Sequence, residues 1–283
     1  MKKAVTVLGL VLIATMAFAT GQQEMAGDEG ESIRLSMGGS TTVEPIITSA
    51  MEVYRDEIDP NAELSYDAPG SSAGIRGLLD GTYGLGAASR SLKDSELEAG
   101  VVPTQIATDG LAVIVNGSVP VDNLSMEQIA AIFVGDITNW SELDGPNEEI
   151  VVVNRDEASG TRGAFLEIVL EAVYGDDAAF TLDALVTESN GNMATMVAQT
   201  PFAIGYASLN VLPRLRETGG KSLSVNGIED TVENVLSGEY PIARPLNVAT
   251  VGEPTGDAKA FIDFLLSERG QEIVAEVDYL PVR

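Results

Sequence analysis

The hydrophobic pattern of the chain alternates between short continuous apolar runs and longer stretches in which apolar residues recur at helical spacing. The segment 150–153 (Ile-Val-Val-Val) is such a run and is typical of a strand buried on both faces. In 164–173, apolar residues recur every three or four positions, which predicts a helix. By these criteria strands are predicted at 33–37, 63–66, 83–88, 111–116, 150–153, 202–207 and 246–251, and helices from 45, at 75–79 and 94–99, from 124, at 164–173, from 190 and at 257–276.

This alternation of strands and helices predicts an α/β architecture. The chain has 283 residues, of which 45% are hydrophobic, enough for one large domain or two medium domains with cores of their own. It contains no internal repeat of fixed period and no long linker rich in glycine, serine or proline. If the protein has two lobes, we therefore expect the chain to cross between them on strands, with 111–116 and 202–207 as the candidates.

Residues 1–19 have the pattern of a signal peptide. A basic start is followed by an apolar stretch over 4–17, and residues 17–19 (Ala-Phe-Ala) form a cleavage signal of small residues. Residues 20–32 are polar and acidic, and we expect them to form a flexible leader. The chain contains no cysteine, which excludes a lipid anchor, disulfides and thiolate metal sites. The sequence thus predicts export to the periplasm or the cell exterior.

The net charge of the chain narrows the choice of partners. It is −27 at pH 7, and loss of Lys2 and Lys3 with the signal peptide leaves −29 (−27 minus 2). Such a surface disfavours nucleic acid and anionic lipid as partners. A small anion is still compatible with it, because at ~0.15 M salt the Debye length is roughly 8 Å and exposed carboxylates are largely screened.

Residues 154–165 join a predicted buried strand to a predicted helix and contain the most informative motif of the chain. Arg155 is followed by the turn Ser159-Gly160-Thr161. A helix N-terminus exposes unpaired N–H groups and a partial positive charge, so it suits a small oxyanion. The two hydroxyls and the guanidinium supply further donors, and the glycine allows close backbone approach.

Two more hydroxyl-rich turns precede predicted helices. Thr41 and Thr42 lie between a strand and the helix from residue 45, and Ser71 lies in the Gly-Ser-Ser-Ala-Gly turn 70–74. Each turn taken alone is explained by helix capping or by a tight turn. Three such turns in one chain, none of which contains histidine or cysteine, indicate a site that binds an oxyanion without reacting with it. The turn 70–74 also has the form of a hydrolase elbow, but the chain has no histidine to act as its base.

Asp109, which precedes Gly110, has two interpretations. It is either a capping or turn aspartate, or a carboxylate that accepts the proton of hydrogen phosphate. Sulfate carries no proton at neutral pH, so a buried carboxylate facing it would leave a hydrogen bond unmade, at a cost of ~1–3 kcal/mol. The second interpretation predicts selection of phosphate over sulfate. The acidic residues show no calcium-loop spacing, and we expect neither a metal nor a cofactor.

In these motifs the chain resembles the periplasmic phosphate-binding proteins of ABC transporters. The matching segments follow the family order from about residue 33 to the C-terminus, so the resemblance covers nearly all of the mature chain. Of the single segments, only the Arg155–Thr161 motif is specific for the family. All the segments together are specific for it. They are 39–45, 70–74, 86–90, 109–113, 137–140, 155–162 and 204–206.

The resemblance implies a two-lobed Venus-flytrap fold of the type II kind, with lobes joined by crossover strands. Lobe 1 would comprise 33–111 and 212–283, and lobe 2 would comprise 112–211. The protein would bind inorganic phosphate with high affinity as a monomer, without enzymatic activity, and deliver it to the permease and ATPase subunits of an ABC transporter. Carried over by motif, the phosphate contacts would be Thr41, Thr42, Ser71, Ser89, Arg155, Ser159, Gly160 and Thr161, with Asp109 as the proton acceptor.

The sequence departs from the family pattern in two places. Some members carry an aspartate where this chain has Ser89, and Ala158 replaces a glycine that is usual before the Ser-Gly-Thr turn. Arg90 is either a further ligand contact or the partner of a carboxylate. Alternative functions are a receptor for sulfate, molybdate or tungstate, a secreted phosphohydrolase, and an adhesive or sensory protein that shares the fold.

Overall fold

The computed structural model describes residues 32–282. The expected signal peptide (1–19) and all but the last residue of the expected leader (20–32) lie outside the described residues. Within 32–282, no helix combines the length and the apolar character needed to cross a bilayer.

Among the described residues, eleven strands form one connected mixed sheet, as the alternating pattern predicts. Its main path has the order β2-β1-β3-β10-β4-β8-β6-β7, and β5, β9 and β11 pair off this path. The strands are β1 (Arg34–Gly39), β2 (Glu63–Asp67), β3 (Leu85–Ala88), β4 (Val101–Asn116), β5 (Asn123–Leu124), β6 (Val151–Arg155), β7 (Leu185–Thr187), β8 (Ala203–Ser208), β9 (Gly220–Val225), β10 (Ala243–Val251) and β11 (Leu280–Pro281).

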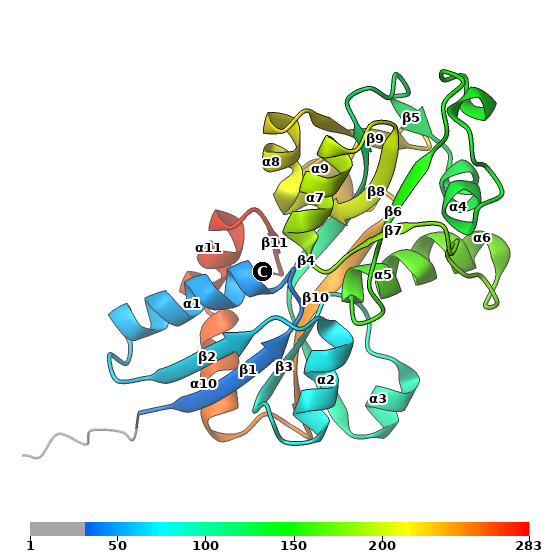
Figure 1. The fold of residues 1–283 in the computed structure, drawn as a ribbon. Helices are drawn as coiled ribbons and strands as arrows, with labels where there is room; N and C mark the ends of the chain where they lie inside the picture. The colour runs from blue at the N-terminus through cyan, green and yellow to red at the C-terminus, as the bar shows by residue number, and fades with distance from the viewer. Residues whose placement is uncertain (1–31, 283) are drawn as a thin grey trace, which may run out of the picture. The chain divides into compact units, whose positions relative to one another are not determined.

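The long strand β4 belongs to both halves of this sheet. Its residues up to Gly110 pair antiparallel with β10, and from Leu111 onward they pair antiparallel with β8. Figure 1 shows β4 and β10 running between the β1–β3 region and the β6–β8 region. We call the elements around β1–β3 lobe 1 and those around β6–β8 lobe 2. The expected two-lobed α/β fold with crossover strands is therefore present.

Helices cover both lobes. Around lobe 1 lie α1 (Glu44–Glu57), α2 (Ser71–Leu79), α3 (Asp94–Glu98), α10 (Gly256–Leu265) and α11 (Glu268–Glu276) (Figure 1). Around lobe 2 lie α4 (Met126–Val134), the 3-10 helix η1 (Trp140–Leu143), α5 (Gly160–Phe165), the π-helix η2 (Leu166–Glu171), α6 (Ala172–Tyr174), α7 (Asn190–Gln199), the 3-10 helix η3 (Leu209–Val211), α8 (Leu212–Glu217) and α9 (Val232–Ser237).

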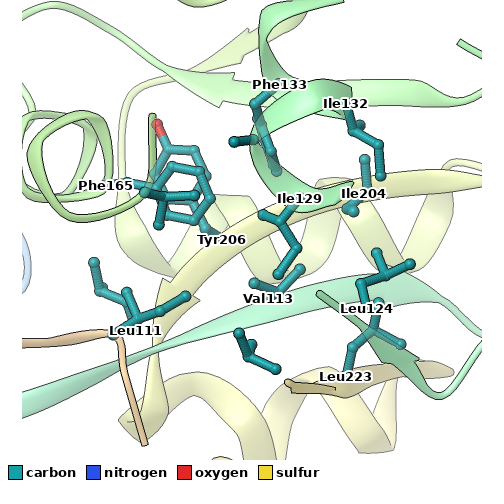
Figure 2. Packing of buried hydrophobic residues seen from close by; sticks show 14 of the residues in the cluster. Leu111, Val113, Leu124, Ile129, Ile132, Phe133, Phe165, Ile204, Tyr206 and Leu223 are labelled. Atoms are coloured by element: carbon teal, nitrogen blue, oxygen red, sulfur yellow. The ribbon is translucent and has the colours of Figure 1, made fainter. Parts of the chain in front are cut away.

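Each lobe buries a hydrophobic core of its own. In lobe 1, side chains of α1, α10 and α11 pack against β1, β2 and β3. In lobe 2, Phe165 stacks on Tyr206 with ring centroids 4.1 Å apart, and Phe133 meets both rings edge-on (Figure 2). Burying one such ring contributes roughly 1.5–3 kcal/mol. The core thereby fixes α5, whose first turn belongs to the candidate site, against β8.

The prediction that 202–207 crosses between the lobes is wrong, because this segment is β8 and lies inside the sheet of lobe 2 between β4 and β6. The other link between the lobes is β10, which pairs with β3 and β4. Before it, β9 pairs with β4, and Leu223, Val225 and Val235 belong to the core of lobe 2. The packing of lobe 2 therefore continues beyond residue 212, where the sequence suggested that lobe 1 resumes.

Three other expectations about elements differ from the structure. The closing helix predicted at 257–276 is divided into α10 and α11, because Ser267 breaks it and its Oγ accepts the N–H of Gly270 at 3.1 Å as the cap of α11. The strand predicted at 111–116 begins at Val101, and its first half mixes exposed and buried positions and so lacks the continuous apolar run of its second half. The strands β5, β7, β9 and β11 and the helices α8 and α9 were not predicted at all.

Candidate functional site

Ser40 organises the turn between β1 and α1. Its Oγ accepts the backbone N–H groups of Thr42 and Val43 at 3.1 and 3.3 Å and donates to Ser89 Oγ at 2.9 Å. The hydroxyl therefore holds the turn that leads into α1 and also ties this turn to the end of β3. All four residues are buried.

The second turn, at the start of α2, depends on a glycine. Gly70 has φ +96°, and a Cβ at this position would lie 2.8 Å from the carbonyl oxygen of Ala158 in lobe 2. The next residue, Ser71, accepts the Ser89 N–H at 3.2 Å through its Oγ, which lies 3.5 Å from Ser89 Oγ. Since β1, β2 and β3 are parallel, their carboxyl ends bring the three turns of lobe 1 to one edge of the sheet.

Arg155 ends β6 and is held from one side by backbone carbonyls. Its Nε donates to Thr187 O at 3.2 Å and its Nη2 to Glu188 O at 2.9 Å. The residue is only 2% exposed, and Nη1 donates no hydrogen bond to any described residue. Burial lowers the pKa of Arg155 from its ordinary value, although a guanidinium stays charged in proteins. A buried charged donor without a partner is costly, which indicates that this nitrogen serves a bound acceptor.

The turn before α5 supplies the remaining contacts of lobe 2. Ser159 Oγ accepts the Arg162 N–H at 3.2 Å and so caps the helix. A Cβ on Gly160 would collide with Ser71 Oγ and lie 2.8 Å from Ser89 Oγ. Thr161 Oγ1 lies 3.2 Å from Thr42 Oγ1. The hydroxyls of lobe 1 therefore meet the first turn of α5 directly.

Asp109 does not stand alone at the site. Its Oδ2 accepts two hydrogen bonds from Arg244, from Nε at 3.1 Å and from Nη2 at 2.8 Å, and its Oδ1 accepts Ser208 Oγ at 2.7 Å. Burial raises the pKa of Asp109 from its ordinary value, while the charge of Arg244 and the bond from Ser208 oppose that rise. A protonated ligand oxygen would therefore have to donate its hydrogen bond to Oδ1, on the side that Ser208 does not occupy.

The structure brings most of the predicted site residues together. Ser159 differs from the others in that its hydroxyl is engaged in capping. Arg90 forms a bidentate ion pair with Glu96, with N–O distances of 2.7 and 2.8 Å. Of the two interpretations of Arg90, pairing with a carboxylate is therefore the correct one. Thr42, Ser71, Ser89, Gly160 and Thr161 form one buried cluster, Arg155 reaches Thr41 Oγ1 at 3.4 Å, and Asp109 is linked to the cluster through Arg244.

Sequence reasoning missed Arg244, Ser208 and Ser40. Arg244 lies in β10 and contacts Thr161 Oγ1 at 2.7 Å and Ser89 O at 2.9 Å. One signal was available, because the chain has only 16 lysines and arginines against 43 acidic residues, and this arginine lies in an apolar segment. Its partner Asp109 is 135 positions away, so no local pattern revealed the pair.

This arrangement offers hydrogen-bond donors and positive charge rather than reactive groups. Hydroxyls from both lobes and the guanidinium of Arg155 converge, and the carboxylate of Asp109 is neutralised by Arg244. In the described part of the chain, no three acidic side chains gather closely enough to hold a metal ion. The cluster is suited to surrounding a small oxyanion with donors.

Comparison with known proteins agrees with this geometry. Residues 21–269 match the model of the PBP superfamily domain. The chain is 35% identical over 252 residues to the phosphate-binding protein PstS of Borreliella burgdorferi, covering 88% of this chain and 90% of the relative. It is 33% identical to the protein of the same name from Bacillus subtilis, covering 100% and 95%.

Solved structures give the same result. A putative phosphate ABC transporter substrate-binding protein from Clostridium perfringens, with bound phosphate, superposes with a TM-score of 0.80 at 37% identity, covering 89% of this chain and 100% of that one. An ABC-type phosphate transport receptor from Vibrio cholerae gives a TM-score of 0.73 at 30% identity, covering 87% and 99%.

Proposed function

The chain belongs to the PBP superfamily and, within it, to the phosphate-binding proteins called PstS, and on this premise we propose that it binds inorganic phosphate between its two lobes. The ligand is held by the cluster of Thr42, Ser71, Ser89, Gly160 and Thr161 together with Thr41 and Arg155. The relatives and the phosphate-bound structure from Clostridium perfringens support this proposal.

One observation carries the proposal: Nη1 of the buried Arg155 has no partner among the described residues, and the same guanidinium reaches Thr41 Oγ1 of lobe 1. A charged donor in such a place is stabilised by an anion with several acceptor oxygens. Phosphate has four oxygens around one centre, so it can accept from both lobes at once. Asp109 remains our proposed acceptor of a phosphate proton, through the part of Oδ1 that Ser208 does not occupy.

Binding is coupled to a hinge motion. The cluster is almost fully buried, and backbone contacts join the lobes beside it, since Ser72 N–H donates to Ala158 O at 3.0 Å. A ligand therefore enters only when the lobes separate, and it stabilises the closed state by bridging them. The crossover strands β4 and β10 are the hinge.

The packing suggests a later boundary for lobe 2 than the sequence did. We assign residues 33–110 and 243–282 to lobe 1 and residues 111–242 to lobe 2, because β9 and Val235 pack with the core of lobe 2. Limited proteolysis with and without phosphate, followed by mass spectrometry, locates the hinge. Cuts near 110 and 243 that phosphate suppresses support this boundary, whereas suppressed cuts near 212 favour the earlier one.

The protein delivers phosphate to the permease and ATPase subunits of an ABC transporter. It acts as an exported monomer that binds its ligand without transforming it. Uptake of radioactive phosphate by cells that lack the chain tests the transport role, and restoration by the wild-type chain is the expected result. A chromogenic phosphate-ester assay with added divalent metals tests the hydrolase alternative, and turnover there would contradict the proposal.

The binding proposal is tested by titration calorimetry of the purified protein. Phosphate is expected to saturate a single site, while sulfate binds at least about a hundredfold more weakly, a cautious minimum for a site that includes an acceptor for the phosphate proton. Tighter binding of sulfate, molybdate or tungstate would make the protein a receptor for that anion instead.

A further inference from the structure

We propose that Arg244 is a positioning residue of this site, which orients the hydroxyl pair of Thr42 and Thr161 so that one of the two donates toward the ligand. The inference rests on the proposed function, because the ligand is taken to be phosphate. It assigns to Arg244 a role in ligand affinity beyond that of a structural ion pair.

The place of Arg244 in the fold is the first argument. In the antiparallel ladder of β10 and β4, Arg244 lies directly opposite Asp109, one residue before β4 changes partner from β10 to β8. This is the junction of the two lobes. A side chain at this point can touch both lobes in the closed state.

The contacts of Arg244 are the second argument. Asp109 takes Nε and one bond from Nη2, in a pair whose side chains are 0% and 1% exposed. This pairing turns Nη1 toward Ser89 O at 2.9 Å in lobe 1 and Thr161 Oγ1 at 2.7 Å in lobe 2. Nη2 also reaches Thr42 Oγ1 at 3.4 Å. Asp109 thus orients the guanidinium of Arg244, and this guanidinium contacts both lobes.

The chemistry of the hydroxyls is the third argument. A guanidinium has donors and no acceptor, so a threonine hydroxyl that accepts from Arg244 must point its own proton elsewhere. Thr42 Oγ1 and Thr161 Oγ1 both accept from Arg244 and lie 3.2 Å apart. Only one of the two protons can lie along the line between them. The other proton is free to donate to an anion oxygen. By occupying the acceptor side of the hydroxyls, Arg244 therefore leaves a hydroxyl proton directed toward the anion.

The first test replaces the planar guanidinium of Arg244, with its several donors, by the single ammonium of a lysine. In Arg244→Lys, a single ammonium keeps the charge beside Asp109 but cannot pair with it and also reach Thr161. We expect the phosphate Kd by calorimetry to rise ~10-fold or more, in line with the loss of a charge-assisted hydrogen bond. In a Thr161→Val background the same change should cost less than ~3-fold, because the hydroxyl it orients is gone.

A second variant separates positioning from stability. Asp109→Asn combined with Arg244→Gln removes both buried charges together, which is often tolerated by the fold. We expect a folded protein by circular dichroism with a phosphate Kd at least ~10-fold above that of Asp109→Asn alone, the variant that lacks only the proposed acceptor of the phosphate proton. Arg269→Lys is the matched control, since Arg269 also pairs with carboxylates but lies on the surface of α11, and its Kd should equal that of the wild type.

The outcomes are distinct. A wild-type Kd in Arg244→Lys, an equal effect of Arg244→Lys in both backgrounds, or a Kd in the double variant equal to that of Asp109→Asn would overturn the inference and leave the proposed function intact. If Thr161→Val by itself abolishes phosphate binding, the phosphate Kd of the double variant tests the inference instead. Wild-type protein that binds no phosphate would refute the proposed function, and the inference with it.

Discussion

Arg155 shows at the scale of one residue how the fold prepares a donor for a ligand. Two of its nitrogens are fixed by carbonyls at the end of β7 and the start of the following turn, and the third is left without a partner among the described residues. The carbonyls orient the side chain without neutralising its charge. The full positive charge is therefore available to an anion, unlike that of Arg244, which Asp109 neutralises.

Arg155→Ala is expected to raise the phosphate Kd by ~100-fold or more, because a buried anion loses its main charged donor. Titration calorimetry measures the change. Arg34→Ala serves as the control, since that side chain is 75% exposed and pairs with Glu63 at the surface. An unchanged Kd in Arg155→Ala would remove this residue from the site.

Gly160→Ala tests the close approach of the two lobes. The added Cβ would collide with Ser71 Oγ, so the closed state is destabilised and the phosphate Kd should rise by ~10-fold or more, consistent with the cost of overpacking. Gly191→Ala is the matched control: it also lies in the first turn of a helix, but its nearest neighbour is the end of the flexible Arg214 side chain at 3.9 Å. Equal affinities of the two variants would show that the lobes do not approach as described.

At the scale of the elements, the site is formed by turns at the carboxyl ends of parallel strands. The sequence was sufficient to predict these turns, because Thr42, Ser71 and Thr161 each lie where a strand is followed by the start of a helix. It was insufficient for Arg244, whose role depends on the ladder that sets β10 against β4. Local patterns identify turns, whereas pairing between distant strands is determined only when the sheet forms.

The small helix α3 shows how an element next to the site is stabilised. Burial acts to raise the pKa of Glu96, but the hydrogen bonds and charge of Arg90, together with the backbone N–H and charge of Lys93, outweigh burial and hold the pKa below its ordinary value. A carboxyl with a lowered pKa contributes stability above its ordinary pKa and loses that contribution as pH falls through the lowered value. The pair therefore stabilises the fold at neutral pH.

Glu96→Gln should lower the free energy of unfolding at pH 7 by ~1–2 kcal/mol, the cost of removing a hydrogen-bonded charge partner in a partly solvated place. The difference from the wild type should shrink as pH falls below ~4.5, the ordinary pKa of a glutamate. Urea unfolding at several pH values measures it. Glu98→Gln, at an exposed position of the same helix, is the control. A difference that is independent of pH would contradict the role of the Arg90–Glu96 pair.

At the scale of the whole molecule, the two lobes enclose a polar cluster between two separate hydrophobic cores. Each core keeps its lobe rigid, and the lobes are joined by β4 and β10, by Leu280, which packs into the core of lobe 2, and by the polar contacts at the site. This division allows the lobes to move as bodies about the strands. The acidic surface keeps the protein soluble, and the buried guanidinium and hydroxyls act where salt and surface charge have little influence.

Small-angle X-ray scattering should detect this movement. Phosphate is expected to reduce the radius of gyration, because it shifts the population from open to closed. Arg155→Ala should show no such change at the same phosphate concentration. A radius of gyration that phosphate leaves unchanged in the wild type would contradict the hinge.

The most direct test of the central claim is calorimetric titration of phosphate into the phosphate-free protein, followed by sulfate at equal ionic strength. We expect one site with a phosphate Kd of ~1 µM or lower, a binding free energy of about −8 kcal/mol or more favourable, and sulfate binding at least about a hundredfold weaker. The absence of saturable heat with phosphate, or equal affinity for the two anions, would contradict it.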